Sequence, residues 1–307
     1  MKRFLSFFDN AYLMAAFATL SWSGNHIVGR AVAGHVPPYW LSMMRWLLPT
    51  VLLTVFCREI IRRDWPLIRS HWKALLFLAF TGGTMFTLLQ YVGLQLTTAL
   101  NVSVLNSLTP VVMVMAAAAI FRDYIVGRQM IGLAVSMVGV LTILSHGDWH
   151  ALTQLAFNKG DVLIVINMAL FGVYAACLRL RPDMHWLSFA FVIASVSAVS
   201  TMPFVAWEYQ SGYRPVFDAA TIGAALYVAL FPGFLSVATW NRATDLIGSN
   251  RAGPFMHLIP LFSAILASLL LGEQIGWFHV AGLALILVGV WLASGKGRAP
   301  APDAASS

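Results

Sequence analysis

Hydrophobic positions run through this chain in long stretches, most of them close to the length that crosses a bilayer. A membrane-spanning helix needs about 20 predominantly apolar residues. The pattern predicts an all-α integral membrane protein with ten such helices. Their expected limits are 11–33, 38–57, 73–95, 98–121, 126–144, 161–179, 185–207, 219–241, 249–271 and 277–293.

Composition and charge place this chain in a membrane. Charged residues make up 10% of the sequence, whereas a soluble domain carries about 25%. The net charge of +7 could suggest a nucleic-acid partner, but most Lys and Arg fall on one side of the alternating topology, and only Lys159 and Arg214 fall on the other. By the positive-inside rule, both termini are cytoplasmic. We expect a multi-pass protein of the bacterial inner membrane, surrounded by lipid, with no nucleic-acid partner.

The second half of the chain repeats the first at an offset of 150 residues. Pro110 falls on Pro260, and residues 132–134 and 138–140 fall on 282–284 and 288–290. Five helices per copy is an odd number, so the second copy enters the membrane from the opposite side and the repeat is inverted. We expect two inverted repeats around a central cavity. They cover residues 1–146 and 161–294, with an outer loop at 147–160 and a disordered cytoplasmic tail at 295–307.

Polar side chains inside the apolar stretches indicate which helix faces avoid lipid, because polar groups are costly there. In the first stretch, Trp22, His26 and Arg30 recur at helical spacing beside Asn25. Small polar residues can also serve helix packing alone, but these side chains are too large for that role, and a cavity-facing stripe is favoured. The predicted substrate-binding residues are Trp22, Asn25, His26, Tyr91, Asn101, Ser103, Asn106, Ser107, Tyr174, Trp240 and His257.

Prolines and glycines interrupt matching positions of the two copies. A proline within a helix frees a carbonyl group and weakens the helix locally. Interrupted helices at equivalent positions of two repeats favour moving elements beside a substrate, although fixed kinks that only shape the bundle are equally compatible. The predicted hinge residues are Pro110, Pro260, Gly82, Gly83, Pro232 and Gly233.

Arg45 lies about two turns into the second stretch, which contains no carboxylate. A deep arginine is usually paired or lines water. It could bind an anionic substrate group, or it could bond to backbone carbonyls, and we give the structural role slightly more weight. Acidic residues such as Asp161 and Glu208 fall at the ends of stretches, which argues against carboxylate-based ion coupling. The two cysteines form no zinc-binding spacing, and we expect neither a metal nor a cofactor.

Residues 97–139 and 248–289 resemble the repeat of the EamA family in the drug/metabolite transporter superfamily. The most specific part is Pro260 followed by Leu-Gly-Glu at 271–273, which the first copy replaces by Phe-Arg-Asp at 121–123. Residues 22–25 (Trp-Ser-Gly-Asn) are similar to the family's Trp-centred first helix, and Arg45 stands where the family commonly has an arginine. The resemblance covers nearly the whole chain.

This resemblance implies a ten-helix exporter of small metabolites that works by alternating access. Among such carriers, the chain is most similar to YddG-type exporters of aromatic and other amino acids. An aromatic and amide-rich lining suits an amino acid or a similar amphiphile. The alternatives are an efflux carrier for drugs or toxic metabolites, and a nucleotide-sugar or sugar-phosphate antiporter, which would need several basic residues in the cavity.

Two other classes of protein fit the sequence less well. A membrane enzyme is not expected, since neither G-x-S-x-G nor H-E-x-x-H occurs. A passive channel would not need interrupted helices in both copies. We expect a carrier for a small molecule that is a monomer or a weak oligomer.

Overall fold

The computed structural model describes residues 10–122, 127–148, 158–247, 255–256 and 258–293. These residues form helices and turns, and no strand occurs among them. The predicted tail at 295–307 and position 257 lie outside the described residues. The elements are α2 (Ala11–Ala31), α3 (Pro38–Phe56), α4 (Arg58–Ser70), α5 (Trp72–Ala79), η1 (Phe80–Met85), α6 (Phe86–Leu96), α7 (Ala99–Asn106), α8 (Thr109–Phe121), α9 (Gly127–Leu144), α11 (Lys159–Cys177), η2 (Leu178–Leu180), α12 (Trp186–Gln210), α13 (Ala219–Leu230), η3 (Phe231–Leu235), α14 (Ser236–Ile247), α16 (Leu258–Leu266), η5 (Ala267–Leu271) and α17 (Trp277–Ala293).

The predicted all-α class is confirmed for the described residues. Five helical segments are long and apolar enough to cross a membrane, and the bent pair of α7 and α8 would make a sixth. Three further apolar helices are shorter. Ten membrane crossings therefore stay a prediction. The five segments are Pro38–Phe56, Trp72–Leu96, Lys159–Leu180, Trp186–Gln210 and Ala219–Ala243.

The hydrophobic pattern places no membrane-spanning helix between residues 57 and 73, and the structure shows a shorter helix in this segment. Helix α4 fills this segment and packs on α12 and α3. Only Ile61 and Asp64 of α4 are buried, and its remaining residues include several arginines. A helix with so narrow a buried face lacks the long apolar run that marks a membrane crossing.

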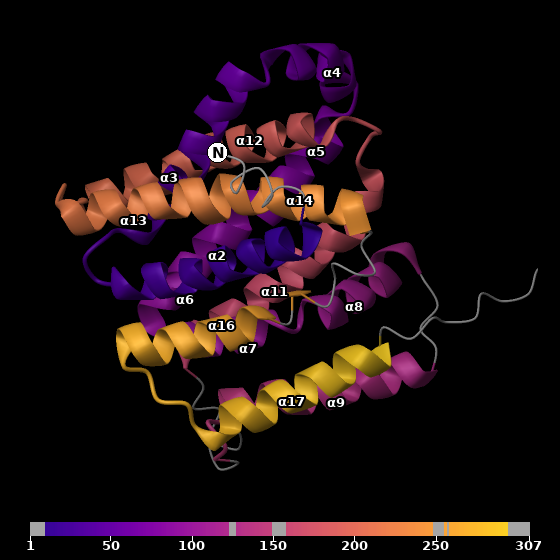
Figure 1. Cartoon of the computed structure of the whole chain (residues 1–307), viewed down its shortest axis with the longest axis vertical. Coiled ribbons are helices and arrows are strands. Elements are labelled where there is room, and N and C mark those ends of the chain that lie inside the picture. The colour runs from indigo at the N-terminus through magenta and orange to yellow at the C-terminus, as the bar shows by residue number, and fades with distance from the viewer. Residues whose placement is uncertain (1–9, 123–126, 149–157, 248–254, 257, 294–307) are drawn as a thin grey trace, which may run out of the picture.

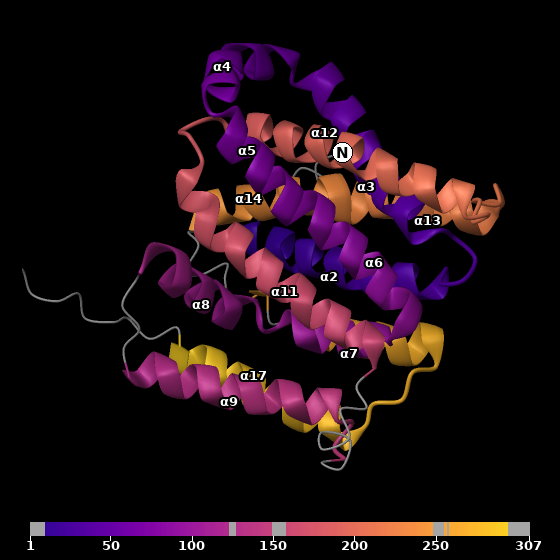
Figure 2. The same cartoon turned by 180° about the vertical axis from the view of Figure 1, so that it is seen from behind.

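Helices from the first half (described residues 10–148) pack mainly against helices from the second half (158–293). Helix α3 contacts α12 and α13, α2 contacts α14 and α16, α11 contacts α6 and α8, and α9 contacts α17. In Figure 1, α13, α14, α2, α16 and α17 lie nearer the viewer, and in Figure 2, α5, α6, α11, α8 and α9 do. Each layer thus contains helices of both halves, and the surface between the halves is the interior of the molecule.

The α9–α17 pair is held together by close approach of the two backbones. A Cβ atom added at Gly139 would lie 2.7 Å from the Gly282 carbonyl oxygen, and one added at Gly289 would lie 2.5 Å from that of Gly132. Small residues that let backbones touch are characteristic of helix interfaces in lipid.

The predicted glycine interruptions lie in π-helical turns. Gly82 and Gly83 belong to η1, and Pro232 and Gly233 belong to η3. Such wide turns are rare and often occur at functional sites. A Cβ atom added at Gly82 would lie 2.3 Å from the ring of Tyr174. The glycines therefore allow close packing, and their role as hinges stays a prediction.

Both predicted hinge prolines stand in the first turn of a helix. Pro110 is the second residue of α8, and Pro260 is the third residue of α16. The chain bends by 50° between α7 and α8, just ahead of Pro110. Because a proline in the first turn loses no helical hydrogen bond, Pro110 begins α8 and does not kink the middle of a helix. For Pro260 the preceding position 257 lies outside the described residues. Whether these positions move as hinges stays a prediction.

Glycine contacts between α9 and α17 predict a specific sensitivity to added volume. We expect Gly139→Ala to lower the free energy of unfolding by about 1–3 kcal/mol, because the methyl group meets backbone. The matched control is Gly223→Ala in α13, where an added Cβ meets no atom within 4 Å. This control should be neutral or stabilise by about 0.5–1 kcal/mol. Unfolding in detergent micelles measures both, and equal effects of the two variants would contradict the proposed packing.

Candidate functional site

The polar stripe of α2 faces the interior of the bundle, as its spacing predicts. Asn10 caps the helix by accepting hydrogen bonds from the backbone N–H groups of Tyr12 and Leu13 at 3.1 and 3.2 Å. Along α2, Asn25 and His26 are buried, whereas Leu13 is 51% exposed. The helix therefore turns its polar groups towards protein and its apolar face outwards.

Five side chains from four helices form what we call the central polar cluster: Asn25 and His26 on α2, Tyr91 on α6, Asn106 on α7 and Ser263 on α16. The Tyr91 hydroxyl donates to Asn25 Oδ1 at 2.6 Å. The Asn106 amide nitrogen lies 3.2 Å from His26 Nε2, and His26 Nδ1 lies 3.4 Å from Ser263 Oγ. Since an amide N–H can only donate, Nε2 accepts and Nδ1 carries the proton. His26 thus links the first half to the second.

Arg45 lies beside this cluster, near the middle of α3. The residue is 7% exposed, and its guanidinium lies 5.6 Å from the Trp46 ring centroid. It is near enough to the Tyr91 hydroxyl and to His26 to interact electrostatically with both. Its Nε atom is buried without a hydrogen-bond partner. Arg45 forms no ion pair with any acidic side chain in the described parts of the chain.

Further buried polar atoms of α7 and η1 also lack partners. These are Asn106 Oδ1 and Ser103 Oγ on α7 and Thr84 Oγ1 in η1. A buried polar group without a partner costs about 1–3 kcal/mol, so such atoms are uncommon in native proteins. Two of these atoms, on Ser103 and Asn106, belong to α7, which also carries the Asn106 amide that is bonded to His26.

Other predicted site residues fall into separate places. Trp22 on α2 and Trp240 on α14 contact each other with ring centroids 5.5 Å apart, and Ser107 donates to the Ser103 carbonyl oxygen at 3.5 Å. Tyr174 instead packs within a different hydrophobic cluster, which contains Trp46. The structure therefore does not bring Tyr174 to the central polar cluster. His257 lies outside the described residues.

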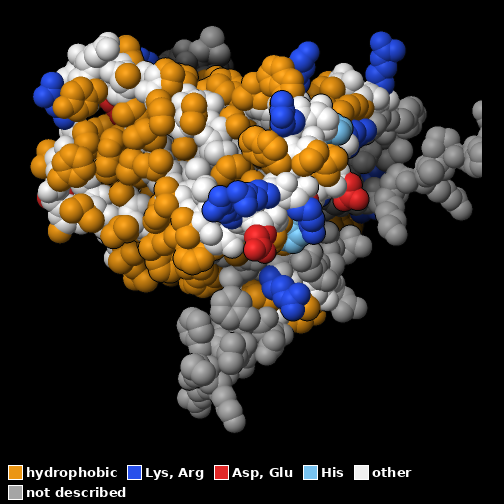
Figure 3. Space-filling model, turned by 90° about the horizontal axis from the view of Figure 1, so that it is seen from above, with side chains coloured by type: hydrophobic (Ala, Val, Ile, Leu, Met, Phe, Trp, Pro, Cys, Tyr) orange, Lys and Arg blue, Asp and Glu red, His pale blue; other side chains and the backbone are white. Residues whose placement is uncertain are grey.

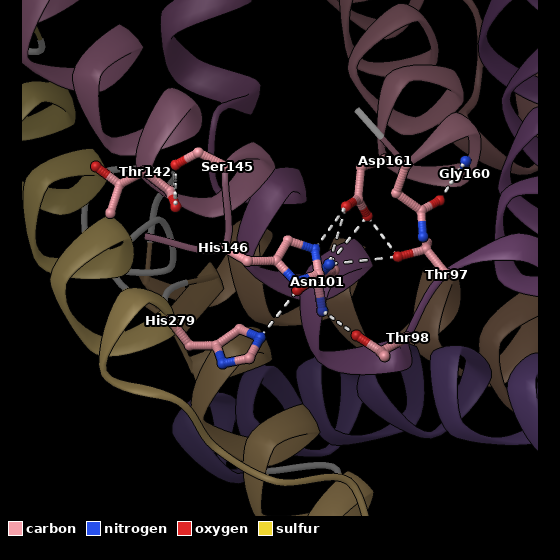
Figure 4. A network of polar contacts seen from close by, with 10 residues as sticks. Thr97, Thr98, Asn101, Thr142, Ser145, His146, Gly160, Asp161 and His279 are labelled. Carbon is pink, nitrogen blue, oxygen red and sulfur yellow. Dashed lines mark hydrogen bonds and ion pairs between the residues drawn. The ribbon is translucent and has the colours of Figure 1, made fainter. Parts of the chain in front are cut away.

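Asn101 belongs to a second network around a buried carboxylate (Figure 4). Its amide nitrogen donates to Asp161 Oδ1 and Oδ2 at 3.1 and 3.0 Å, and Thr97 also donates to Asp161. His279 Nδ1 accepts the Gly276 N–H at 2.9 Å, so its Nε2 donates to Asn101 Oδ1, also at 2.9 Å. His146 Nε2 lies 3.7 Å from Asp161. Asn101 is thus fully engaged in the network and contacts no member of the central cluster through these bonds.

Sequence reasoning missed this network because Asp161 stands at the start of α11. Its position there suggested a solvated helix end, yet Asp161 is 0% exposed. The nearby Asn158, which caps α11 by accepting the Gly160 N–H at 2.7 Å, was the available signal that this helix end is ordered. Among the described residues, no three His, Cys, Asp or Glu side chains are grouped as a metal site requires.

Carboxylates also cap helix N-termini across the two halves. Glu273 accepts the N–H groups of Ala99 and Leu100 at 2.9 and 3.0 Å, at the start of α7. Glu208 accepts those of Tyr39 and Trp40 at 3.1 and 2.9 Å, at the start of α3. Free N–H groups and the helix dipole favour a carboxylate at such a position. These bonds hold one half against the other, a role that the sequence pattern of Glu273 did not reveal.

Asp64 of α4 has the equivalent role at α12. Its Oδ2 accepts the His185 N–H at 2.8 Å, and Arg63 Nε donates to its Oδ1 at 3.1 Å. Burial would raise the pKa of the Asp64 carboxyl from its ordinary 3.8, but hydrogen bonds from Ser188, the His185 backbone and Arg63 outweigh burial and lower the pKa. The carboxylate therefore stays ionised where it caps the helix.

Known proteins match nearly the whole chain. Residues 9–145 and 158–295 each match the model of the EamA-like transporter family. An uncharacterized transporter of Archaeoglobus fulgidus is 27% identical over 295 residues, covering 94% of this chain and 98% of that protein. The inner membrane protein YtfF of Escherichia coli is 24% identical and covers 92% and 94%, respectively. One crystal structure with 17% identity covers 92% of this chain and 96% of its own, at a TM-score of 0.56, which indicates a shared fold.

The lowered pKa of Asp64 predicts an acid-dependent contribution to stability. Above pH 3.8, the value of the unfolded chain, the ionised cap is fully present. As the pH falls through the lower folded-state pKa, this contribution is lost. Asp64→Asn keeps an acceptor oxygen but removes the charge, and we expect it to lower the free energy of unfolding by about 0.3–1 kcal/mol at pH 7. Thermal unfolding from pH 7 to pH 3 should show wild type and variant converging at the acid end.

The exposed Asp183 provides the matched control, since no cap depends on it. Asp183→Asn should follow the wild-type curve throughout. A constant difference between Asp64→Asn and wild type down to pH 3 would show that ionisation of Asp64 does not carry the effect.

Proposed function

The chain belongs to the EamA-like transporter family, and on that premise we propose that it exports small organic metabolites, with amino acids as the leading class, by alternating access. The coarser part of this statement follows from the family and from relatives that are named as transporters: the protein is a multi-pass membrane transporter of small molecules.

One observation carries the proposal of a site between the halves, namely the burial of the central polar cluster. His26 of the first half is bonded to Ser263 of the second, and also to Asn106. Polar side chains that are buried inside an apolar helix bundle are expensive and usually serve a substrate pathway. Carriers built from repeats bind their substrates at the contact between the repeats. The cluster has both properties.

The chemistry of the surrounding side chains favours an amphipathic substrate. Asn25, Asn106 and His26 supply amide and imidazole groups that can bond to carboxylate and ammonium groups. The Trp22–Trp240 pair, on helices that pack together, supplies aromatic faces, which hold rings or cations. An amino acid, aromatic in the first instance, offers partners for both kinds of group.

Two observations support an inverted arrangement of two repeats. The family model matches once in each half. Contacts between the halves also occur in exchanged pairs: α2 packs on α14 as α11 packs on α6, while α3 pairs with its counterpart α12 and α9 with α17. A two-fold relation between the halves generates such pairs. We therefore keep ten crossings and an inverted repeat as part of the proposal.

The distribution of charge supports an orientation with cytoplasmic termini. Figure 3 views the molecule from the α4 end: hydrophobic side chains cover much of this face, and most Lys and Arg gather towards one side. Four of the arginines belong to α4, and they are Arg58, Arg62, Arg63 and Arg69. A basic segment next to an apolar band favours the cytoplasmic surface. The name of the relative YtfF supports an inner-membrane location.

Flux measurements test the proposal directly. Proteoliposomes that contain the purified protein are loaded with radiolabelled phenylalanine, tryptophan or threonine. We expect saturable efflux that is accelerated by unlabelled substrate on the opposite side, since a carrier shows counter-exchange and a channel does not. Absence of saturable flux for every amino acid would remove this substrate class but leave the fold and family intact.

Replacement of His26 tests the central polar cluster. His26→Ala removes the bonds to Asn106 and Ser263, and loss of such buried bonds corresponds to about a tenfold decrease in flux at low substrate concentration. The matched control is His71→Ala, because His71 is exposed between α4 and α5. Both variants should remain folded by gel filtration. Wild-type flux in His26→Ala would place the substrate elsewhere.

A further inference from the structure

We propose that the transported molecule carries a carboxylate group and that Arg45 binds this group between α2, α3 and α6. The inference rests on the proposed function, since it concerns the same site, and it names the chemistry that the site recognises. Arg45 thereby takes the role of a specificity-determining residue and not of a structural one.

The Arg45 guanidinium has no counter-charge among the described side chains. Arg45 stands in the middle of α3, is 7% exposed, and forms no ion pair among the described residues. A guanidinium stays protonated in proteins, so burial cannot neutralise it. Burying a charge without a partner is strongly unfavourable. A bound anion would remove this penalty.

The Arg45 guanidinium also has N–H donors that the described residues leave without an acceptor. A guanidinium offers five N–H groups in a planar fork that matches a carboxylate. Arg45 Nε is buried and has no hydrogen-bond partner. The Tyr91 hydroxyl, which donates to Asn25, lies near enough to interact electrostatically with the guanidinium. Among the described residues, the guanidinium therefore keeps donors that a ligand could use.

Arg30 provides a comparison, because its guanidinium has a structural role in which it bonds to backbone carbonyl oxygens. Arg30 on α2 is part-buried, and its Nη1 donates to the carbonyl oxygens of Leu94 and Gln95 at 3.0 and 3.3 Å. These bonds fasten α2 to the end of α6. Within the described ranges, Arg45 makes no such bond to a backbone carbonyl. The protein itself thus supplies hydrogen-bond acceptors for Arg30 but leaves Arg45 Nε without one.

The surroundings favour a carboxylate over a phosphate ester. A phosphate dianion would need several cations, and Arg45 is the one cationic side chain that the described contacts bring to Tyr91 and His26. The unpartnered Asn106 Oδ1, on the residue bonded to His26, is an acceptor that could take an N–H or O–H of the same ligand. A carboxylate with a nearby donor group matches both.

Binding measurements on the purified full chain in detergent test this inference without transport. The probes are acid and amide pairs that differ only in the carboxylate: phenylalanine and phenylalaninamide, 3-phenylpropionate and its amide, with inorganic phosphate as a separate probe. Ligand-induced thermal stabilisation gives the affinity for each. We expect wild type to prefer the acid by about 30-fold, and Arg45→Gln to reduce this preference to about one. Arg45→Lys keeps the charge but loses the fork, and it should show an intermediate preference.

Arg30→Gln is the matched control: it should destabilise the protein and keep the preference for the acid. The inference is overturned if wild type binds acid and amide equally, if no carboxylate stabilises it, if phosphate binds more tightly than either acid, or if Arg45→Gln retains the preference. Should Arg45→Gln fail to fold, the wild-type ratio and Arg45→Lys still decide. If the protein prefers acids in binding but transports no amino acid, the proposed function is contradicted and the role of Arg45 in carboxylate binding is not.

Discussion

A helix bundle in lipid must satisfy its polar groups from within, because no water is available in the hydrocarbon region. This constraint accounts for several polar contacts between the two halves. Helix N-termini receive carboxylates from the opposite half, as Glu273 and Glu208 show, and Asn101 is enclosed by Asp161 and His279. Several buried polar atoms fall short of this requirement, and Arg45 Nε is the one among them that belongs to a charged group. We propose that a transported anion supplies its missing partner.

Regions whose polar groups are fully hydrogen-bonded differ from regions whose polar groups are not, and this difference bears on which contacts between the halves are strong. A carrier that opens to one side at a time must break some contacts between its halves and keep others. The two-oxygen cap of Glu273 holds its helix firmly. Helices α2 and α16 are joined by the long contact between His26 and Ser263, at 3.4 Å, and by the Ser23 hydroxyl, which donates to the Ile259 carbonyl oxygen at 3.0 Å. The π-helical turns η1 and η3 lie within the helices that flank this region. Movement around the central polar cluster stays a prediction.

Sequence reasoning succeeded where one periodic property decides the structure. The apolar stretches predicted the helices, and the spacing of Asn25 and His26 predicted the inward face of α2. It failed where distant residues decide. The sequence around α4 does not predict the contact of this helix with α12. Only the tertiary fold places Asp161 next to Asn101, and only the fold separates Tyr174 from His26. The position of Arg45 in an apolar stretch is unusual in the sequence, but only the tertiary structure shows that its Nε has no partner. Local sequence alone leaves a structural role and a binding role open.

The most direct test of this account is an experimental structure of the protein with 3-phenylpropionate or phenylalanine bound. The account predicts ligand density between α2, α3 and α6, with the carboxylate within hydrogen-bonding distance of the Arg45 guanidinium and the rest of the molecule towards His26 and Asn106. Density for the carboxylate at any other place, with the Arg45 side chain bonded to backbone carbonyls, would contradict it.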